Sequence, residues 1–188
     1  MIFAEPTLVH LIWPALALVG VLIYLEVSRQ AQMDAFVSAA MRERLVGLGL
    51  DPTAFTLVDG SGLSRHNRVS PRVIVEALQL ARSSFAVGPE LVAALPIGAR
   101  DGTLQKRADA AGERIRAKTG LLDSVTGLSG YAELSNGRDV IFSILVNGYR
   151  AGDEAAMGAV DGFVAALVNT PLAGIAAGRA ADRAAWAP

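Results

Sequence analysis

Residue types that could do chemistry gather in three short segments. These are residues 59–67 (DGSGLSRHN), residues 95–104 (LPIGARDGTL) and residues 117–131, which contain AKTG and GLSGY. In the first segment, Ser64 lies two residues before His66, which could suggest a catalytic dyad of a nucleophilic serine and a histidine base. Catalytic groups of this kind usually converge from distant parts of a chain. The pair therefore does not predict a catalytic dyad.

A Lys-Thr-Gly triplet alone is a weak signal, because chance often supplies it. In this order and at these spacings, however, the three segments closely resemble the low-molecular-mass class C penicillin-binding proteins. These are serine D-Ala-D-Ala carboxypeptidases and endopeptidases of peptidoglycan. The resemblance extends over about residues 44–149, a little over half of the chain.

The resemblance implies a site on an edge strand beside a serine nucleophile. The ammonium of Lys118 would bind the terminal carboxylate of the substrate and set the local field for proton transfer, so Lys118 is the candidate catalytic residue. The hydroxyl of Thr119 would donate to the same carboxylate, and Gly120 would let the substrate backbone lie close to the strand. The implied ligands are peptidoglycan stem peptides and β-lactams, and the implied location is the bacterial cell envelope.

The same resemblance makes residues 59–67 a structural turn near the active site. Its glycines permit positive φ angles, and Asp59 or Asn67 would hydrogen-bond the backbone. Asp101 is likewise expected to be a turn residue rather than a catalytic acid.

The acylating half of such a site is missing from this sequence. The family uses Ser-x-x-Lys, in which the lysine takes the proton of the nucleophilic serine. The two lysines, Lys106 and Lys118, are preceded at three residues by Thr103 and Ile115. A Ser-x-Asn motif is absent as well, and both motifs would be expected before residue 50. We therefore expect this polypeptide alone to be inactive.

Composition excludes several other classes of function. The 188 residues include no cysteine, which excludes disulfides, thiolate metal sites and a cysteine nucleophile. His10 and His66 are too few and too far apart for a zinc site, and no cofactor is expected. The net charge of −1 gives no attraction to nucleic acid.

The N-terminal part is the most apolar. Residues 8–25 (LVHLIWPALALVGVLIYL) contain no Asp, Glu, Lys or Arg and would span about 27 Å as a helix, close to the thickness of the hydrocarbon core of a bilayer. A membrane helix and a buried core helix both remain open. The first basic residue, Arg29, follows this stretch and would leave the rest of the chain in the cytoplasm, whereas cell-wall substrates require the opposite orientation.

Periodicity and turn signals then predict the other elements. They are an amphipathic helix over residues 26–48, a strand over 56–58, helices starting at Pro71 and over 89–95 and 104–111, strands over 114–119, 127–134 and 140–147, and a helix over 153–168. Ser70 is the expected N-cap of the helix that starts at Pro71. Asn136-Gly137 between two apolar runs predicts a hairpin.

This order predicts an α+β fold in which an antiparallel sheet packs against helices. We expect an N-terminal helix and connector in residues 1–43, a partial transpeptidase-like domain in 44–170 and a loosely ordered tail in 171–188. An open sheet edge predicts oligomerisation or a partner chain. Two other hypotheses remain: a non-catalytic, membrane-anchored interaction protein, or a truncated or fused reading frame.

Overall fold

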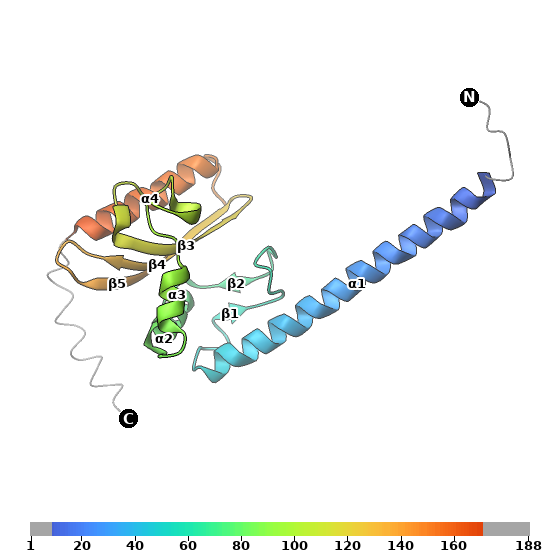
Figure 1. Ribbon diagram of the computed structural model, residues 1–188, viewed down its shortest axis with the longest axis horizontal. Coiled ribbons are helices and arrows are strands. Elements are labelled where there is room, and N and C mark those ends of the chain that lie inside the picture. The colour runs from blue at the N-terminus through green and yellow to red at the C-terminus, as the bar shows by residue number, and fades with distance from the viewer. Residues whose placement is uncertain (1–8, 171–188) are drawn as a thin grey trace. The chain divides into compact units, whose positions relative to one another are not determined.

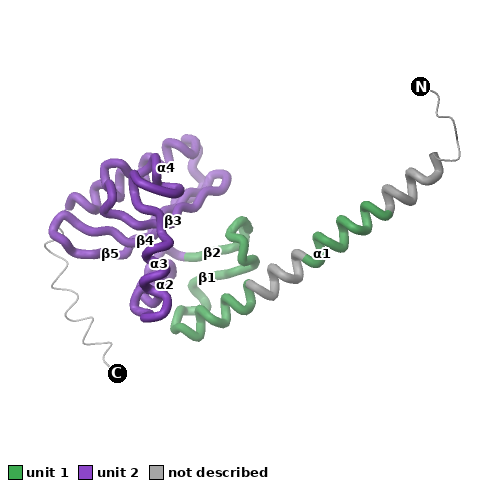
Figure 2. The backbone as a smooth tube through the Cα atoms, viewed as in Figure 1, with its two compact units in different colours: residues 1–69 green, residues 70–188 purple. Residues whose placement is uncertain are grey.

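A computed structural model describes residues 9–170, apart from the side chains of residues 9–17 and 30–37. The chain divides into two compact units, residues 1–69 and residues 70–188 (Figures 1 and 2). The expected tail, residues 171–188, lies outside the described residues.

The first unit begins with one long helix, α1 (Val9–Gly47). The sequence predicted an apolar helix followed by a separate amphipathic one, and the structure joins them without a break (Figure 1). The predicted end is confirmed. Gly49 takes φ 94°, and its N–H donates to the carbonyl of Val46 as the chain leaves the helix. Glycine adopts such a φ without the steric cost that a side chain would add.

The membrane prediction rested on residues 8–25, of which residues 8–17 lie outside the described side chains. Within the part of the chain that the structure does describe, no helix combines the length and the apolar composition that crossing a bilayer requires.

A short antiparallel ladder completes the first unit. Strand β1 (Phe55–Thr56) pairs with β2 (Arg68–Val69). The strand predicted over residues 56–58 is shorter than expected because the N–H of Val58 donates to the Oδ1 of Asn67 instead of to a neighbouring strand. The carbonyl of Val58 accepts from the buried hydroxyl of Ser38 in α1. The ladder is thereby tied to the helix.

The second unit opens with two helices, α2 (Pro71–Ser83) and α3 (Gly88–Ala94). The prediction for the start of α2 is confirmed. The side chain of Ser70 accepts from the N–H of Val73, and Pro71 occupies the first turn, where its missing N–H costs nothing.

A three-stranded antiparallel sheet in the order β3-β4-β5 forms the centre of this unit. Its strands are β3 (Ile115–Leu122), β4 (Val125–Glu133) and β5 (Asp139–Asn147). The predicted hairpin between β4 and β5 is confirmed. Gly137 adopts φ 74° and donates its N–H to the carbonyl of Leu134.

Helices cover both faces of the sheet (Figure 1). Helix α4 (Asp153–Asn169) packs on β4, and α2 packs on β5 and β4. The core between α4 and the sheet is apolar and well sealed, as Ile115, Leu128, Val164 and Val168 are fully buried. On the other face, the hydroxyl of Tyr131 donates to the carbonyl of Leu78 in α2 at 2.8 Å. The predicted α+β fold is confirmed.

The prediction of a helix over residues 104–111 is wrong. The chain forms only short 3₁₀ turns, η2 (Gly102–Leu104) and η3 (Gly112–Arg114). The N–H of Ala99 takes the carbonyls of Leu104 and Arg107, which a helix would have used, and Ala108 has φ 56°. Apolar periodicity cannot reveal this competition, because it arises from a backbone group outside the segment.

Candidate functional site

The site predicted from the sequence lies on β3, which is an edge strand among the described residues. Only the first half of its outer edge is paired. A β-bridge joins Ile97 to Arg116. The N–H of Gly98 donates to the carbonyl of Ile115 at 3.1 Å, and the N–H of Ala117 donates to the carbonyl of Pro96 at 3.0 Å. The pairing stops there, immediately before Lys118.

Beyond Ala117, the backbone N–H and C=O groups of β3 continue to point alternately toward β4 and toward the outer edge. In an antiparallel strand, the N–H and C=O of alternate residues point to the same side. Because the groups of Ile115 and Ala117 point away from β4, those of Thr119 and Leu121 point to that outer edge as well. The groups of Gly120 point inward, and it pairs with Gly127 of β4. An extended ligand could therefore bond to the second half of β3.

Lys118 is exposed, and its ammonium donates to the carbonyl of Thr119 at 2.6 Å. Within the described part of the chain, no carboxylate forms an ion pair with it. A primary ammonium has three donors, so two remain for a ligand. The structure thus keeps a positive charge at the open edge without a neutralising partner there.

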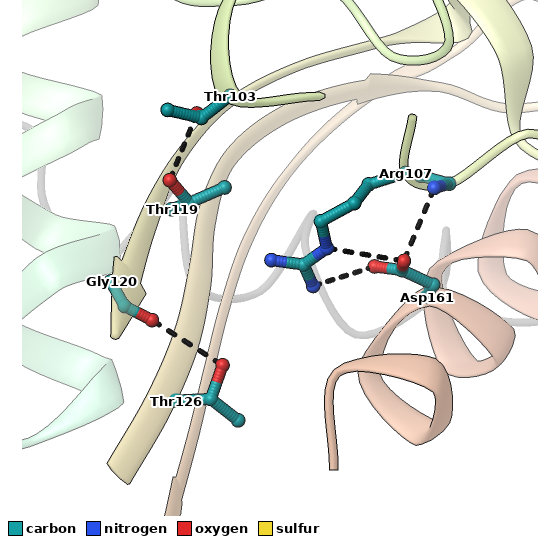
Figure 3. A network of polar contacts seen from close by, with 7 residues as sticks. Thr103, Arg107, Thr119, Gly120, Thr126 and Asp161 are labelled. Carbon is teal, nitrogen blue, oxygen red and sulfur yellow. Dashed lines mark hydrogen bonds and ion pairs between the residues drawn. The ribbon is translucent and has the colours of Figure 1, made fainter. Parts of the chain in front are cut away.

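The hydroxyl of Thr119 forms a hydrogen bond to the hydroxyl of Thr103 at 2.9 Å (Figure 3). Thr103 belongs to η2, sixteen residues earlier in the chain. In the sequence, this threonine belongs to the second segment, residues 95–104, and lies three residues before Lys106. Its contact with the Lys-Thr-Gly strand has no signal in local sequence, since the fold alone brings the two residues together.

Gly120 leaves the strand open to approach. A Cβ added there would meet no atom within 4 Å. Its carbonyl accepts from the hydroxyl of Thr126, which is fully buried, at 3.3 Å (Figure 3). This bond fixes the peptide plane of Gly120 from the inner side while the outer side stays clear.

Two other glycines permit the close packing that places β3. A Cβ on Gly130 would lie 2.1 Å from the carbonyl oxygen of Arg116, and one on Gly98 would lie 2.5 Å from that of Gly112. Real Cβ atoms do not come so close to backbone oxygens. Gly98 of the second sequence segment and Gly130 of the third are therefore required by the packing on the two edges of β3.

An ion pair missed by the sequence analysis anchors the loop before β3. The guanidinium of Arg107 donates twice to the carboxylate of Asp161 in α4, at 2.8 and 3.2 Å (Figure 3). The same carboxylate accepts from the N–H of Ala108 at 3.2 Å. Both side chains are largely buried, at 15% and 19% exposure. The two residues are 54 positions apart, so no short motif could indicate the pair.

The turn residues behave as the sequence predicted. In the first unit, Asn67 accepts from the N–H groups of Val58 and Asp59, and Ser64 accepts from the N–H of His66 instead of pairing with its imidazole. In the second unit, Asp101 accepts from the N–H of Ile97 at 2.6 Å. These side chains shape backbone, which confirms their structural role.

Comparison with known proteins decides the family. The family model described as D-Ala-D-Ala carboxypeptidase 3 (S13) family matches residues 22–169, most of the chain. The chain belongs to this family. The resemblance seen in the three sequence segments is thereby confirmed.

Individual relatives agree with this assignment. The chain is 36% identical over 102 residues to the D-alanyl-D-alanine carboxypeptidase DacB of Haemophilus influenzae, covering 52% of this chain and 21% of the relative. It is 38% identical over 116 residues to the D-alanyl-D-alanine carboxypeptidase of an Actinomadura species, covering 58% and 21%. The chain therefore spans about a fifth of the length of these curated relatives.

A solved structure shows the same fold. Penicillin binding protein 4 (dacB) from Haemophilus influenzae, complexed with a β-lactam, superposes with a TM-score of 0.63 at 28% identity. The superposition covers 71% of this chain and 33% of that one.

Proposed function

We propose that this chain supplies the carboxylate-binding strand of a D-Ala-D-Ala peptide site in a serine-type carboxypeptidase. The observation that carries the proposal is the unneutralised ammonium of Lys118 at the open half of an edge strand, beside the hydroxyl of Thr119. Membership of the S13 family supports the substrate class.

The geometry suits a short peptide that ends in a carboxylate. The ammonium of Lys118 and the hydroxyl of Thr119 provide charge-assisted and neutral donors for that carboxylate. The outward N–H and C=O groups of Thr119 and Leu121 would pair with the ligand backbone as an added strand. The empty space above Gly120 admits the ligand without a clash.

Acylation would require groups from elsewhere. No serine in this sequence has a lysine three residues after it. Losing the nucleophile of a covalent catalyst typically costs many orders of magnitude in rate. We therefore propose that these residues bind the ligand reversibly by themselves, and that the serine nucleophile comes from another polypeptide segment.

The open side of β5 is the proposed place for such a partner or for a second copy. Among the described residues β5 is the other edge of the sheet, and apart from Asp139 it carries no charge. Val140, Ile144 and Val146 pack against the core only in part. An uncharged, apolar edge invites another strand. Because peptidoglycan peptides are extracytoplasmic, the proposed location is the cell envelope, with anchoring by residues 1–43.

The proposal is tested by titrating the protein into a fluorescent peptide that ends in D-Ala-D-Ala. The fluorescence anisotropy of the peptide measures its reversible binding. We expect saturable binding that Lys118→Ala weakens by about 10- to 100-fold, the range of one charge-assisted hydrogen bond. Lys106→Ala removes the only other lysine, which is also exposed, and should leave affinity unchanged. Equal loss in both variants, or no binding by the unmodified chain, would contradict the proposal.

A parallel gel assay with a fluorescent penicillin tests the missing nucleophile. We expect no covalent label and no mass increase in the intact protein. A label that Lys118→Ala abolishes would mean that a serine of this chain acts as the nucleophile.

A further inference from the structure

The loop before β3 places a second hydroxyl next to the Lys-Thr-Gly strand. Thr103 lies in η2, and its Oγ1 is 2.9 Å from the Oγ1 of Thr119 (Figure 3). We propose that Thr103 is a positioning residue: it orients the hydroxyl of Thr119 toward a bound carboxylate. This inference rests on the proposed function.

Thr103 is held in place from both sides. Asp101 lies two residues before Thr103. Its carboxylate accepts from the N–H of Ile97, and its backbone carbonyl accepts from the N–H of Leu104. The side chain of Leu104 is fully buried in the core. Farther along, Arg107 ties the loop to Asp161 of α4. The hydroxyl therefore stands on a fixed loop although it is exposed.

The hydroxyls of Thr103 and Thr119 can exchange the roles of donor and acceptor. Each threonine hydroxyl has one proton to donate and lone pairs to accept with. Without a ligand, Thr119 donates to Thr103. A carboxylate can only accept, so the proton of Thr119 must turn toward it when a ligand binds. Thr103 can then donate its own proton to the Oγ1 of Thr119, so that the direction of the hydrogen bond between the two hydroxyls is reversed.

The reversal keeps both hydroxyls paired in the free and the bound state. A chain of two hydrogen bonds that ends on an anion also polarises each member, which strengthens the bond to the ligand. Without the hydroxyl of Thr103, the Thr119 hydroxyl loses its partner and its preferred direction. The effect should be specific to a ligand that carries a carboxylate.

The experiment measures the affinity of the full chain for two fluorescent peptides, one ending in D-Ala-D-Ala carboxylate and one in the corresponding amide. We expect Thr103→Val to weaken binding of the carboxylate by about 3- to 10-fold, the usual effect of one neutral hydrogen bond. Binding of the amide should change little. Thr103→Ser retains the hydroxyl and should restore the affinity for the carboxylate.

The outcomes separate this inference from the proposed function. If the unmodified chain binds the carboxylate and Thr103→Val binds it equally well, Thr103 has no positioning role and the proposed function stands. If Thr103→Val weakens both peptides equally, or if Thr103→Ser fails to rescue, the residue acts on the loop as a whole and the inference is wrong. If the unmodified chain binds neither peptide, both proposals fail.

Discussion

The carboxylate of Asp161 in α4 accepts two hydrogen bonds from the guanidinium of Arg107 and a third from the backbone N–H of Ala108. One side chain of the C-terminal helix thereby holds the loop that leads to β3. The loop carries strained backbone, because Ala99 and Ala108 both have φ near 57°. Non-glycine residues adopt this conformation only where their surroundings enforce it.

Asp161→Ala should therefore destabilise the protein. The substitution leaves a largely buried guanidinium and a backbone N–H without their acceptor, which typically costs about 1 to 3 kcal/mol in the free energy of unfolding. Urea denaturation followed by circular dichroism measures the loss. Glu113→Gln is the matched control, because its ion pair with Arg100 is more than half exposed on both sides. That change should stay within about 0.5 kcal/mol. Equal effects would mean that Asp161 does not anchor the loop.

Gly130 offers a test of how β4 and β3 pack. We expect Gly130→Ala to cost about 2 to 4 kcal/mol, because the new Cβ would lie 2.1 Å from the carbonyl oxygen of Arg116 and 2.6 Å from the Cα of Ala117. Backbone atoms cannot move aside as the end of a side chain can.

The opposite sign is expected for a glycine on α4. A Cβ on Gly158 would meet nothing within 4 Å, so Gly158→Ala should stabilise the protein by about 0.5 to 1 kcal/mol through helix propensity. Thermal melts of the two variants should shift in opposite directions. A melt of Gly130→Ala at the unmodified temperature would show that the strands separate easily there.

Local signals were enough to predict most of the fold. Ser70-Pro71 gave the start of α2, and Asn136-Gly137 gave the hairpin, because in both cases a few adjacent residues determine the backbone. The edge position of β3 followed from the family resemblance. The order of elements then indicated an antiparallel sheet with helices.

The parts that could not be predicted depend on distant contacts. The backbone of residues 104–111 is set by Ala99, whose N–H takes carbonyls that a helix needs. The contact of Thr103 with Thr119 and the pairing of Arg107 with Asp161 join segments 16 and 54 residues apart. Periodicity and motifs describe neighbours along the chain, so they carry no information on such pairs.

Amide hydrogen exchange should show whether the outer edge of β5 is exposed to solvent. Every second N–H of residues 140–146 bonds to β4, and the others point away from it. At low protein concentration we expect slow exchange at the first set and fast exchange at the second, resolved by two-dimensional NMR. If a second copy covers this edge, the fast set should slow as concentration rises. Slow exchange of all these amides in a dilute monomer would mean that the edge is already covered.

Tyr149 should make stability depend on pH in the alkaline range. Partial burial, together with the hydrogen bond that its hydroxyl donates to Asp153 at 2.7 Å, raises the pKa of Tyr149 to about 12 from an ordinary value of 10.0. The unfolded chain releases this proton near pH 10, whereas the folded chain holds it until about pH 12. The contribution of Tyr149 to stability is therefore complete below pH 10 and is lost as the pH rises toward 12.

Two measurements check this expectation. Absorbance titration at about 295 nm should show a last phenol ionising near pH 12, and Tyr149→Phe should remove that step. Urea midpoints between pH 8 and pH 11.5 should fall less steeply in Tyr149→Phe than in the unmodified chain. Some decline remains in the variant because burial also raises the pKa of Tyr131. Identical slopes for the two proteins would contradict a raised pKa at Tyr149, since only a difference between folded and unfolded pKa values couples this group to stability.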